Sequence, residues 1–287
     1  MAATTAWHVR NSLRVIGLHL RLTSTLTALI EKAIRLELPL FQSFLVVQES
    51  GKLLVPDAQD VQTFIALRQK YFKDVFMHGS YWINVANIRM NRHYNLQREL
   101  KLAHQLEYSH IILHPGSAKG AQLKSEGIDA VARVLNKIFS KTPHIRIVLE
   151  NGAHGNLTVG SDLEDFKTIL EKLKFPDSIS FCIDTAHAHS YGYDLSSMSA
   201  QEVFIDILEE TIGIERIALL HLNDTKQIRG SKVDKHEIIG DGVIGDEALK
   251  QFVLNPRIAH IPLIMELPEL SEEEEYKVLD KVRAWHK

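Results

Sequence analysis

The sequence predicts an α/β fold, a single (β/α)8 TIM barrel, because eight short apolar runs alternate with eight longer amphipathic segments along the chain. Six of these runs end in a histidine or a carboxylate, and the active sites of such barrels lie at the carboxyl ends of the strands. No linker rich in Gly, Ser or Pro interrupts the alternation, so we expect one domain over residues 1–287.

Each apolar run is short enough for one buried parallel strand. The expected strands are Val15–Leu20, Leu40–Val47, Asp74–His78, His110–His114, Ile145–Glu150, Ile179–Asp184, Arg216–His221 and Ile261–Glu266. The segments between them carry apolar residues at helical spacing. The expected helices are Thr25–Leu36, Ala58–Tyr71, Arg92–Leu106, Ser125–Phe139, Asp162–Leu173, Ala200–Thr211, Asp246–Leu254 and Ser271–Trp285. The last begins with a capping-box pattern, Ser271 followed three residues later by Glu274.

The composition is that of an ordinary globular protein, with 45% hydrophobic and 24% charged residues. No apolar run approaches the roughly 18 residues that suggest a membrane span. The first ten residues lack the apolar centre of a signal peptide. One cysteine, Cys182, excludes an intramolecular disulfide and favours a reducing compartment. We therefore expect a cytoplasmic protein that does not contact membranes.

The net charge is −3, from 33 Lys and Arg against 36 Asp and Glu. This balance argues against binding of nucleic acid through bulk positive charge. Bound metals would change it, since three divalent ions would move the sum to about +3, concentrated at one end of the barrel. The mildly acidic chain therefore does not exclude a phosphate-rich substrate.

The polar residues that end the last six strands are all good ligands for a divalent transition metal: His78, His114, Glu150, Asp184, His221 and Glu266. Three further ligands lie nearby. His187 follows Asp184 by three residues, and the long polar loop after the seventh strand carries Asp234 and His236. In an extended segment those two side chains point the same way. Five imidazoles and four carboxylates favour zinc, manganese or iron over calcium or magnesium.

Each of these residues also has a plain structural explanation. A strand-end histidine can be a hydrogen-bonded rim residue, and the pair on the long loop can face water. Glu150 and Glu266 can pair with lysines, but each ends a buried apolar run, where an unpaired charge costs several kcal/mol. His189 lies close to His187 and is an alternative ligand.

The motifs together resemble those of endonuclease IV, a family of trinuclear-zinc apurinic/apyrimidinic (AP) endonucleases on a TIM barrel. The matching segments run in order from about residue 74 to the end of the chain. They are His78-Gly-Ser-Tyr-Trp-Ile-Asn84, His114-Pro-Gly-Ser117, Glu150-Asn151, Cys182-Ile-Asp-Thr-Ala-His187, Gly192-Tyr-Asp194, His221-Leu-Asn-Asp224, Asp234-Lys-His236-Glu-Ile-Ile-Gly-Asp-Gly242 and Ile264-Met-Glu266. The resemblance selects His187 over His189 and fills all nine ligand positions.

The resemblance implies three Zn2+ ions per chain, for which Mn2+ or Fe2+ could substitute. The first zinc would be held by His78, His114 and Glu150. Glu150 would bridge to a second zinc, whose other ligands would be Asp184, His221 and Glu266. The third would be held by His187, Asp234 and His236. Glu150 and Glu266 are the expected catalytic residues, and the expected substrate contacts are Tyr81, Trp82, Asn84 and Lys235.

Phosphodiester hydrolysis is the reaction class that such a cluster favours. Two metals about 3.5–4 Å apart can activate a shared water and hold both oxygens of an in-line displacement. A third metal can neutralise charge on the leaving oxygen. The resemblance implies cleavage 5′ to abasic sites in damaged double-stranded DNA and removal of 3′-blocking groups. We expect the protein to act as a monomer.

Two other functions compete with this one. A metal-dependent sugar or sugar-phosphate isomerase of the xylose-isomerase-like type would use strand-end ligands but needs one or two metals. The pair Asp234 and His236 distinguishes the two enzymes, because a two-metal isomerase has no use for it. A DNA-lesion binder that has lost cleavage would not need the intact set of ligands.

The resemblance is weakest near the N-terminus. The family usually carries Gly-Ala-His-x-Ser and a Gly pair after the first strand, where this chain reads Gly17-Leu-His19-Leu-Arg-Leu-Thr-Ser24. An Asn- and Arg-rich loop is replaced by Leu45-Val-Val-Gln-Glu-Ser-Gly-Lys52, which has no arginine. We therefore predict weaker DNA binding over a smaller footprint, because each lost phosphate contact lowers the salt dependence of log K by about 0.9.

Overall fold

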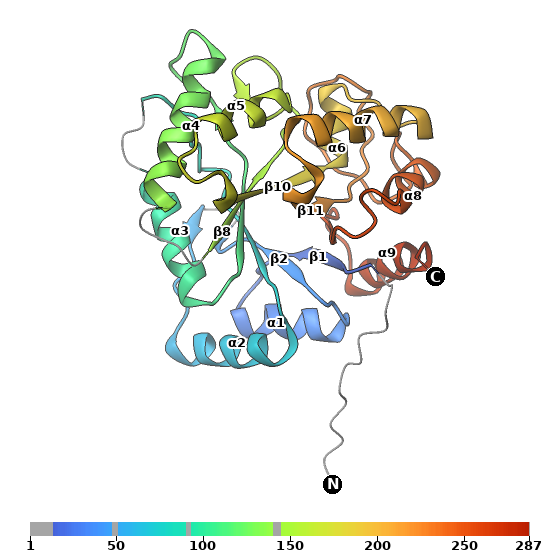
Figure 1. Cartoon of the computed structure of the whole chain (residues 1–287). Coiled ribbons are helices and arrows are strands. Elements are labelled where there is room, and N and C mark those ends of the chain that lie inside the picture. The colour runs from blue at the N-terminus through green and yellow to red at the C-terminus, as the bar shows by residue number, and fades with distance from the viewer. Residues whose placement is uncertain (1–13, 48–50, 90–92, 140–144, 287) are drawn as a thin grey trace.

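The computed structural model describes residues 14–47, 51–89, 93–139 and 145–286 (Figure 1). Within these residues, eight parallel strands close into a barrel, which confirms the predicted fold. In their order around the barrel they are β1 (Ile16–Leu20), β2 (Phe41–Ser43), β5 (Phe76–His78), β6 (His110–Leu113), β8 (Arg146–Glu150), β10 (Ile179–Asp184), β11 (Ile217–His221) and β12 (Leu263–Met265). Strand β12 pairs with β1 and closes the ring.

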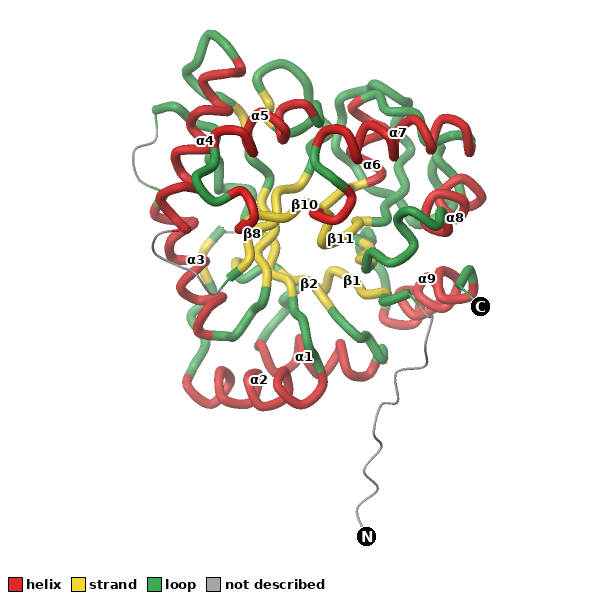
Figure 2. The backbone as a smooth tube through the Cα atoms, in the orientation of Figure 1, coloured by secondary structure: helices red, strands yellow, loops and turns green. Residues whose placement is uncertain are grey.

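Helices surround the barrel on all sides of the view in Figures 1 and 2. They are α1 (Leu26–Arg35), α2 (Ala58–Tyr71), α3 (Tyr94–Gln105), α4 (Lys124–Phe139), α5 (Glu164–Lys172), α6 (Thr185–Tyr191), α7 (Met198–Thr211), α8 (Asp246–Leu254) and α9 (Glu272–Ala284). Short 3-10 helices, η1 (Pro176–Ser178) and η2 (Ile214–Arg216), lead into β10 and β11. The predicted capping box of α9 is present, with Ser271 and Glu274 each accepting from the other's backbone N–H.

The second predicted strand is wrong over its second half. Strand β2 ends at Ser43, where its neighbour β1 also ends, so the chain has no further barrel partner on that side. It leaves the barrel and forms a hairpin of β3 (Val46–Val47) and β4 (Lys52–Leu53). Residues 48–50 and residue 92, the expected start of a helix, lie outside the described residues.

A helix that we did not predict, α6, follows β10 directly. Asp184 caps it by accepting a hydrogen bond of 2.8 Å from the backbone N–H of His187. Residues 185–190 of this helix are all buried, so the segment lacks the alternation of apolar and polar residues that reveals a surface helix. The turn of α6 places His187 at the mouth of the barrel.

The barrel interior contains a layer of buried, mostly apolar side chains: Leu40, Phe76, Ile112, Val148, Cys182, Leu219 and Ile264. Side chains two residues apart on a strand face the same way. Two residues after the members of this layer come Gln42, His78, His114, Glu150, Asp184, His221 and Glu266. The alternation therefore directs these polar side chains into the barrel mouth, above an apolar floor.

A further small sheet lies beside the mouth, where β7 (Gly116–Ser117) pairs with β9 (Thr158–Val159). It joins the loops that follow β6 and β8. Among the described residues, no helix is long and apolar enough to cross a lipid bilayer.

Candidate metal centre

Glu150 stands at the centre of the cluster that the barrel mouth assembles. Its side chain is fully buried at the end of β8. His78 Nε2 lies 3.0 Å and His114 Nε2 lies 3.4 Å from one carboxylate oxygen. The other oxygen lies 2.8 Å from His221 Nδ1 and 3.4 Å from His187 Nδ1. The carboxylate thus lies between two pairs of imidazoles.

Asp184 and Glu266 complete a second group of donors around His221. His221 Nδ1 lies 3.5 Å from Glu266 Oε2 and 3.9 Å from Asp184 Oδ2. These three residues and Glu150 offer ligand atoms that all lie within 4.8 Å of one another. Glu266 and His114 do not end their strands as predicted, since each lies one residue beyond. Their direction into the mouth is unchanged, because the alternation continues for one more residue.

The pair on the long loop reaches the same cluster. Asp184, His187 and His236 offer ligand atoms within 4.8 Å of one another. Asp234 Oδ1 lies 3.0 Å from His187 Nε2 and 3.7 Å from His236 Nε2. The interpretation of this pair as residues facing water is therefore wrong, although 33% of the Asp234 side chain stays exposed.

His189 takes no part in the cluster. It lies on α6 and approaches the backbone of Gln227, in the loop after β11. The structure therefore brings together all nine residues predicted as ligands and leaves this alternative aside.

The buried carboxylates are balanced by histidines. Within the described residues, the ion pairs of Glu150, Glu266, Asp184 and Asp234 all have imidazole partners and none is with a lysine or arginine. Burial would raise the pKa of Glu150, but the imidazoles of His114 and His221 hold that pKa well below its usual range. The pairing with lysines considered from the sequence is thus not found.

Three of the histidines have one ring nitrogen fixed by a carbonyl oxygen. The bonds are His78 Nδ1 to Gly79 O (2.8 Å), His187 Nδ1 to Asn151 O (3.0 Å) and His221 Nε2 to Gln42 Oε1 (2.9 Å). A carbonyl oxygen can only accept, so each of these nitrogens carries a proton. The other nitrogen of each ring donates to a carboxylate oxygen at 2.8–3.0 Å, and it becomes able to bind a metal ion once it has lost that proton. Metal-bound histidines have their second nitrogen fixed in this way, and the donor set fits divalent transition metals.

Gln42 and His19 belong to the site, although we did not predict them. Gln42 accepts from His221 and donates to Glu266 Oε1 at 2.6 Å. His19 Nδ1 lies 3.2 Å from the same carboxylate oxygen. Both follow interior residues by two positions, as the predicted ligands do. Both therefore fit the alternation that located the predicted ligands, and Gln42 was missed because the expected strand over Leu40–Val47 ended too late.

A single buried carboxylate organises the long loop that carries Asp234 and His236. Asp224 is fully buried and accepts from backbone N–H groups on the far side of the loop. The donors include Gly240 (3.0 Å), Gly242 (3.2 Å) and Ile244 (3.2 Å). Gly242 is required for this approach, because a Cβ there would lie 2.2 Å from Asp224 Oδ1. Hydrogen bonds to one side chain thus fix a loop that has little regular structure.

The predicted aromatic contacts lie at the rim of the site, on the loop after β5. Tyr81 is 75% exposed and Trp82 is 64% exposed. The Tyr81 ring lies 5.5 Å from that of Phe44, which in turn lies 5.0 Å from the ring of His78. The Trp82 indole lies against the backbone of Gly51 in the β3–β4 hairpin. Both aromatic side chains are therefore accessible at the rim, and Tyr81 lies beside the cluster.

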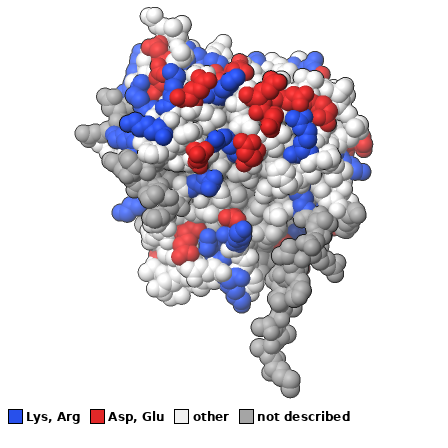
Figure 3. All heavy atoms as spheres, in the orientation of Figure 1, with Lys and Arg blue, Asp and Glu red and all other residues white. Residues whose placement is uncertain are grey.

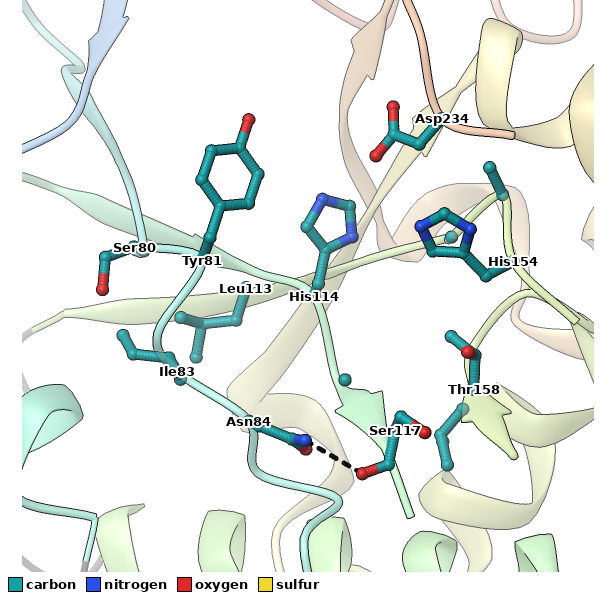
Figure 4. Close-up of a pocket in the computed structure, with 15 residues that line it drawn as sticks. Ser80, Tyr81, Ile83, Asn84, Leu113, His114, Ser117, His154, Thr158 and Asp234 are labelled. Carbon is teal, nitrogen blue, oxygen red and sulfur yellow. Dashed lines mark hydrogen bonds between the residues drawn. The ribbon is translucent and has the colours of Figure 1, made fainter. Parts of the chain in front are cut away.

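The remaining predicted contacts line two cavities at the mouth. Asn84 donates a hydrogen bond of 3.0 Å to the backbone of Ser117 and lines a cavity of about 200 Å³ beside His114 (Figure 4). Lys235 is exposed and lines a second cavity, of about 300 Å³, with Glu266.

Comparison with known proteins places the chain in a family. Residues 41–285 match a family model described as a xylose isomerase-like TIM barrel. A probable endonuclease 4 of Thermosipho africanus is 34% identical over 235 residues, which are 79% of this chain and 83% of the relative. The chain belongs to the endonuclease IV family. A second probable endonuclease 4, of Halorhodospira halophila, is 36% identical over 201 residues, 68% of this chain and 67% of the relative.

Solved structures agree with this assignment. Endonuclease IV from Thermus thermophilus matches with a TM-score of 0.80 and 27% identity, over 95% of this chain and 98% of that chain. A D-tagatose 3-epimerase-like protein matches with a TM-score of 0.68 and 19% identity, over 94% and 96% of the two chains, which shows a shared fold alone. The resemblance to endonuclease IV is confirmed, and membership of this family together with the clustered ligands indicates a metal-dependent enzyme.

Replacing Asp224 with asparagine should loosen the long loop while the barrel stays folded. One acceptor oxygen becomes an amide that faces backbone N–H groups, and a buried donor without a partner costs about 1–3 kcal/mol. We expect amide hydrogen exchange at Gly240 and Gly242 to accelerate by about 5-fold to 100-fold. Exchange measured by mass spectrometry should stay unchanged in β8. The control is Asp241→Asn, an exposed position in the same loop; equal exchange in both variants would contradict the role of Asp224.

Proposed function

We propose that this chain is a zinc-dependent AP endonuclease with three zinc ions. It hydrolyses the phosphodiester 5′ to abasic sites in double-stranded DNA and removes 3′-blocking groups. The observation that carries the proposal is the convergence of five imidazoles and four carboxylates at the barrel mouth of an endonuclease IV family member. The expected monomeric state stays a prediction.

The contacts support the partition of the ligands among three ions. Glu150 is suited to bridge two ions, since one of its oxygens faces His78 and His114 and the other faces His221. One ion takes the pair His78 and His114 with Glu150. A second takes Asp184, His221 and Glu266 with Glu150. The third takes His187, Asp234 and His236, which join α6 to the long loop.

When bound, the metals would lower the pKa of a coordinated water and neutralise charge that develops on the phosphate and on the leaving oxygen. The chain's own contribution is orientation. The carbonyl oxygens of Gly79 and Asn151 and the side chain of Gln42 fix three imidazoles in the tautomer that can coordinate. The buried layer of the barrel interior excludes water from below the cluster.

Engagement of DNA depends on the rim, because the chain as a whole carries a charge of −3. Basic and acidic side chains are interspersed on the face shown in Figure 3. Several cations of the loops around the mouth are already paired with carboxylates: Arg21 with Glu269, Lys226 with Glu237 and Arg229 with Asp194. Such pairs leave less positive charge for DNA phosphates. We therefore assign much of the binding to the exposed rings of Tyr81 and Trp82.

The substitution Glu150→Gln should reduce cleavage of an abasic duplex by more than about 100-fold, the upper range for loss of an outer partner of a ligand. The reason is that the bridge loses one anionic oxygen and two ions are affected together. Cleavage is measured on a gel with a labelled oligonucleotide, and circular dichroism checks the fold. The control Glu210→Gln changes an exposed glutamate on α7 and should have no effect. Near-wild-type cleavage by the first variant would refute the bridging role.

The substitution Trp82→Ala should raise KM on abasic duplex DNA while kcat changes little. Stacking of a base on an aromatic ring is worth about 1–3 kcal/mol, which corresponds to an increase of about 5-fold to 100-fold. Steady-state kinetics separate the two parameters. Phe175→Ala is a matched control, because this aromatic is 55% exposed at the opposite end of the barrel, before β10. A KM unchanged by Trp82→Ala would show that DNA contacts another surface.

A further inference from the structure

His154 has the geometry of a site residue but belongs to none of the ligand sets. It lies four residues after Glu150, on the loop between β8 and β9. Its Nδ1 lies 2.9 Å from the backbone oxygen of Lys232, in the loop that carries Asp234. Because that oxygen can only accept, Nδ1 carries the proton, and in the neutral ring Nε2 is left as an acceptor. The same kind of bond orients His187.

The free nitrogen belongs to a side chain that lines the cavity beside the cluster. His154, His114 and Asp234 all line this cavity of about 200 Å³, and Figure 4 shows His154 across from His114. Apolar side chains form part of its wall, including Ile83, Leu113 and Val159. Amide and hydroxyl groups form another part, from Asn84, Ser117 and Thr158. Apolar surface with a few polar groups suits a sugar ring, whose faces are apolar and whose edges carry oxygens.

Several polar groups of this cavity accept hydrogen bonds, so they favour a ligand group that donates one. Asp234 is assigned to the third ion, and its carboxylate adds no donor to the wall. Asn84 uses its amide N–H toward Ser117, and its Oδ1 is buried without a partner among the described residues. With Nε2 of His154, the wall offers acceptors that a phosphate oxygen cannot satisfy. A sugar hydroxyl can donate to one of them.

We propose that His154 is a specificity-determining residue that accepts a hydrogen bond at Nε2 from the sugar hydroxyl of the abasic nucleotide. In the ring-closed form of an abasic site, this hydroxyl stands at C1′, where the base has been lost. The inference rests on the proposed function, since it assigns the sugar of that substrate to the cavity. It predicts that the enzyme distinguishes a natural abasic site from its tetrahydrofuran analogue, which lacks the C1′ hydroxyl.

The test compares kcat/KM on two duplexes that differ in this hydroxyl alone. We expect the wild-type protein to prefer the natural site by about 3-fold to 10-fold, the effect of one hydrogen bond. His154→Asn retains an N–H that can reach Lys232 O but removes Nε2. The preference should fall to about one in this variant, while cleavage of the tetrahydrofuran duplex and the metal content stay at wild-type values. Fluorescence anisotropy with the same duplexes, recorded before they are cleaved, should show the same loss of preference in Kd.

Two further variants separate substrate contact from a structural role. His154→Ala removes both nitrogens, and His260→Ala changes an exposed histidine before β12, at the opposite end of the barrel. If His154 only tied the two loops together, His154→Asn would behave as wild type, and His154→Ala would lower cleavage of both duplexes equally. That result would overturn the inference, as would an undiminished preference in His154→Asn. Failure of the wild type to cleave either duplex would instead overturn the proposed function, and this inference with it.

Discussion

The site depends on the alternation of side chains along the barrel strands. A residue that points into the barrel is followed two positions later by another that does, and near the carboxyl ends the second one reaches the mouth. Val148 and Glu150 on β8 illustrate the pattern, as do Leu219 and His221 on β11. The apolar residue fixes the register of its strand by burial, and the polar residue is carried into the site by the same register. A shift by one residue would turn the ligand toward the surrounding helices.

Carboxylates at this depth need positive charge close by, because an unpaired one is costly in a buried environment. The chain meets that need with histidines and supplies no lysine or arginine to the four carboxylates within the described residues. Imidazoles can be neutral, so they can also present lone pairs to a metal. The hydrogen bonds from His78 and His221 to carbonyl oxygens favour that use. The cluster is thus suited to cations by its tautomers as well as by its composition.

Much of the fold and of the candidate site could be predicted from the sequence, because both follow from short-range patterns. Strand periodicity located the barrel, and the strand-end residues such as Asp184 and His221 followed from it. The helix α6 could not be predicted in this way, since it is buried on every side and shows no amphipathic pattern. Gln42 was missed because the end of β2 depends on where its neighbour β1 stops pairing.

The loop after β11 shows a different limit. Its ligands could be recognised by type and spacing, but their position depends on hydrogen bonds from glycines 16 and 18 residues away to Asp224. No local pattern predicts such bonds. The cavity that His154 lines also depends on contacts between distant segments, because it lies between loops that follow different strands. Tertiary contacts between distant loops therefore decide the details of the site, while the strands decide its location.

The central claim is that the nine residues hold three metal ions. Elemental analysis by mass spectrometry of the purified protein, and of the double variant Asp234→Ala/His236→Ala, tests it most directly. The account predicts close to three ions per chain in the wild type and two in the double variant, because the loop pair serves one ion. One or two ions in the wild type would contradict it and favour a sugar isomerase. Loss of all metal, or of none, in the double variant would contradict the assignment of the third ion to the loop.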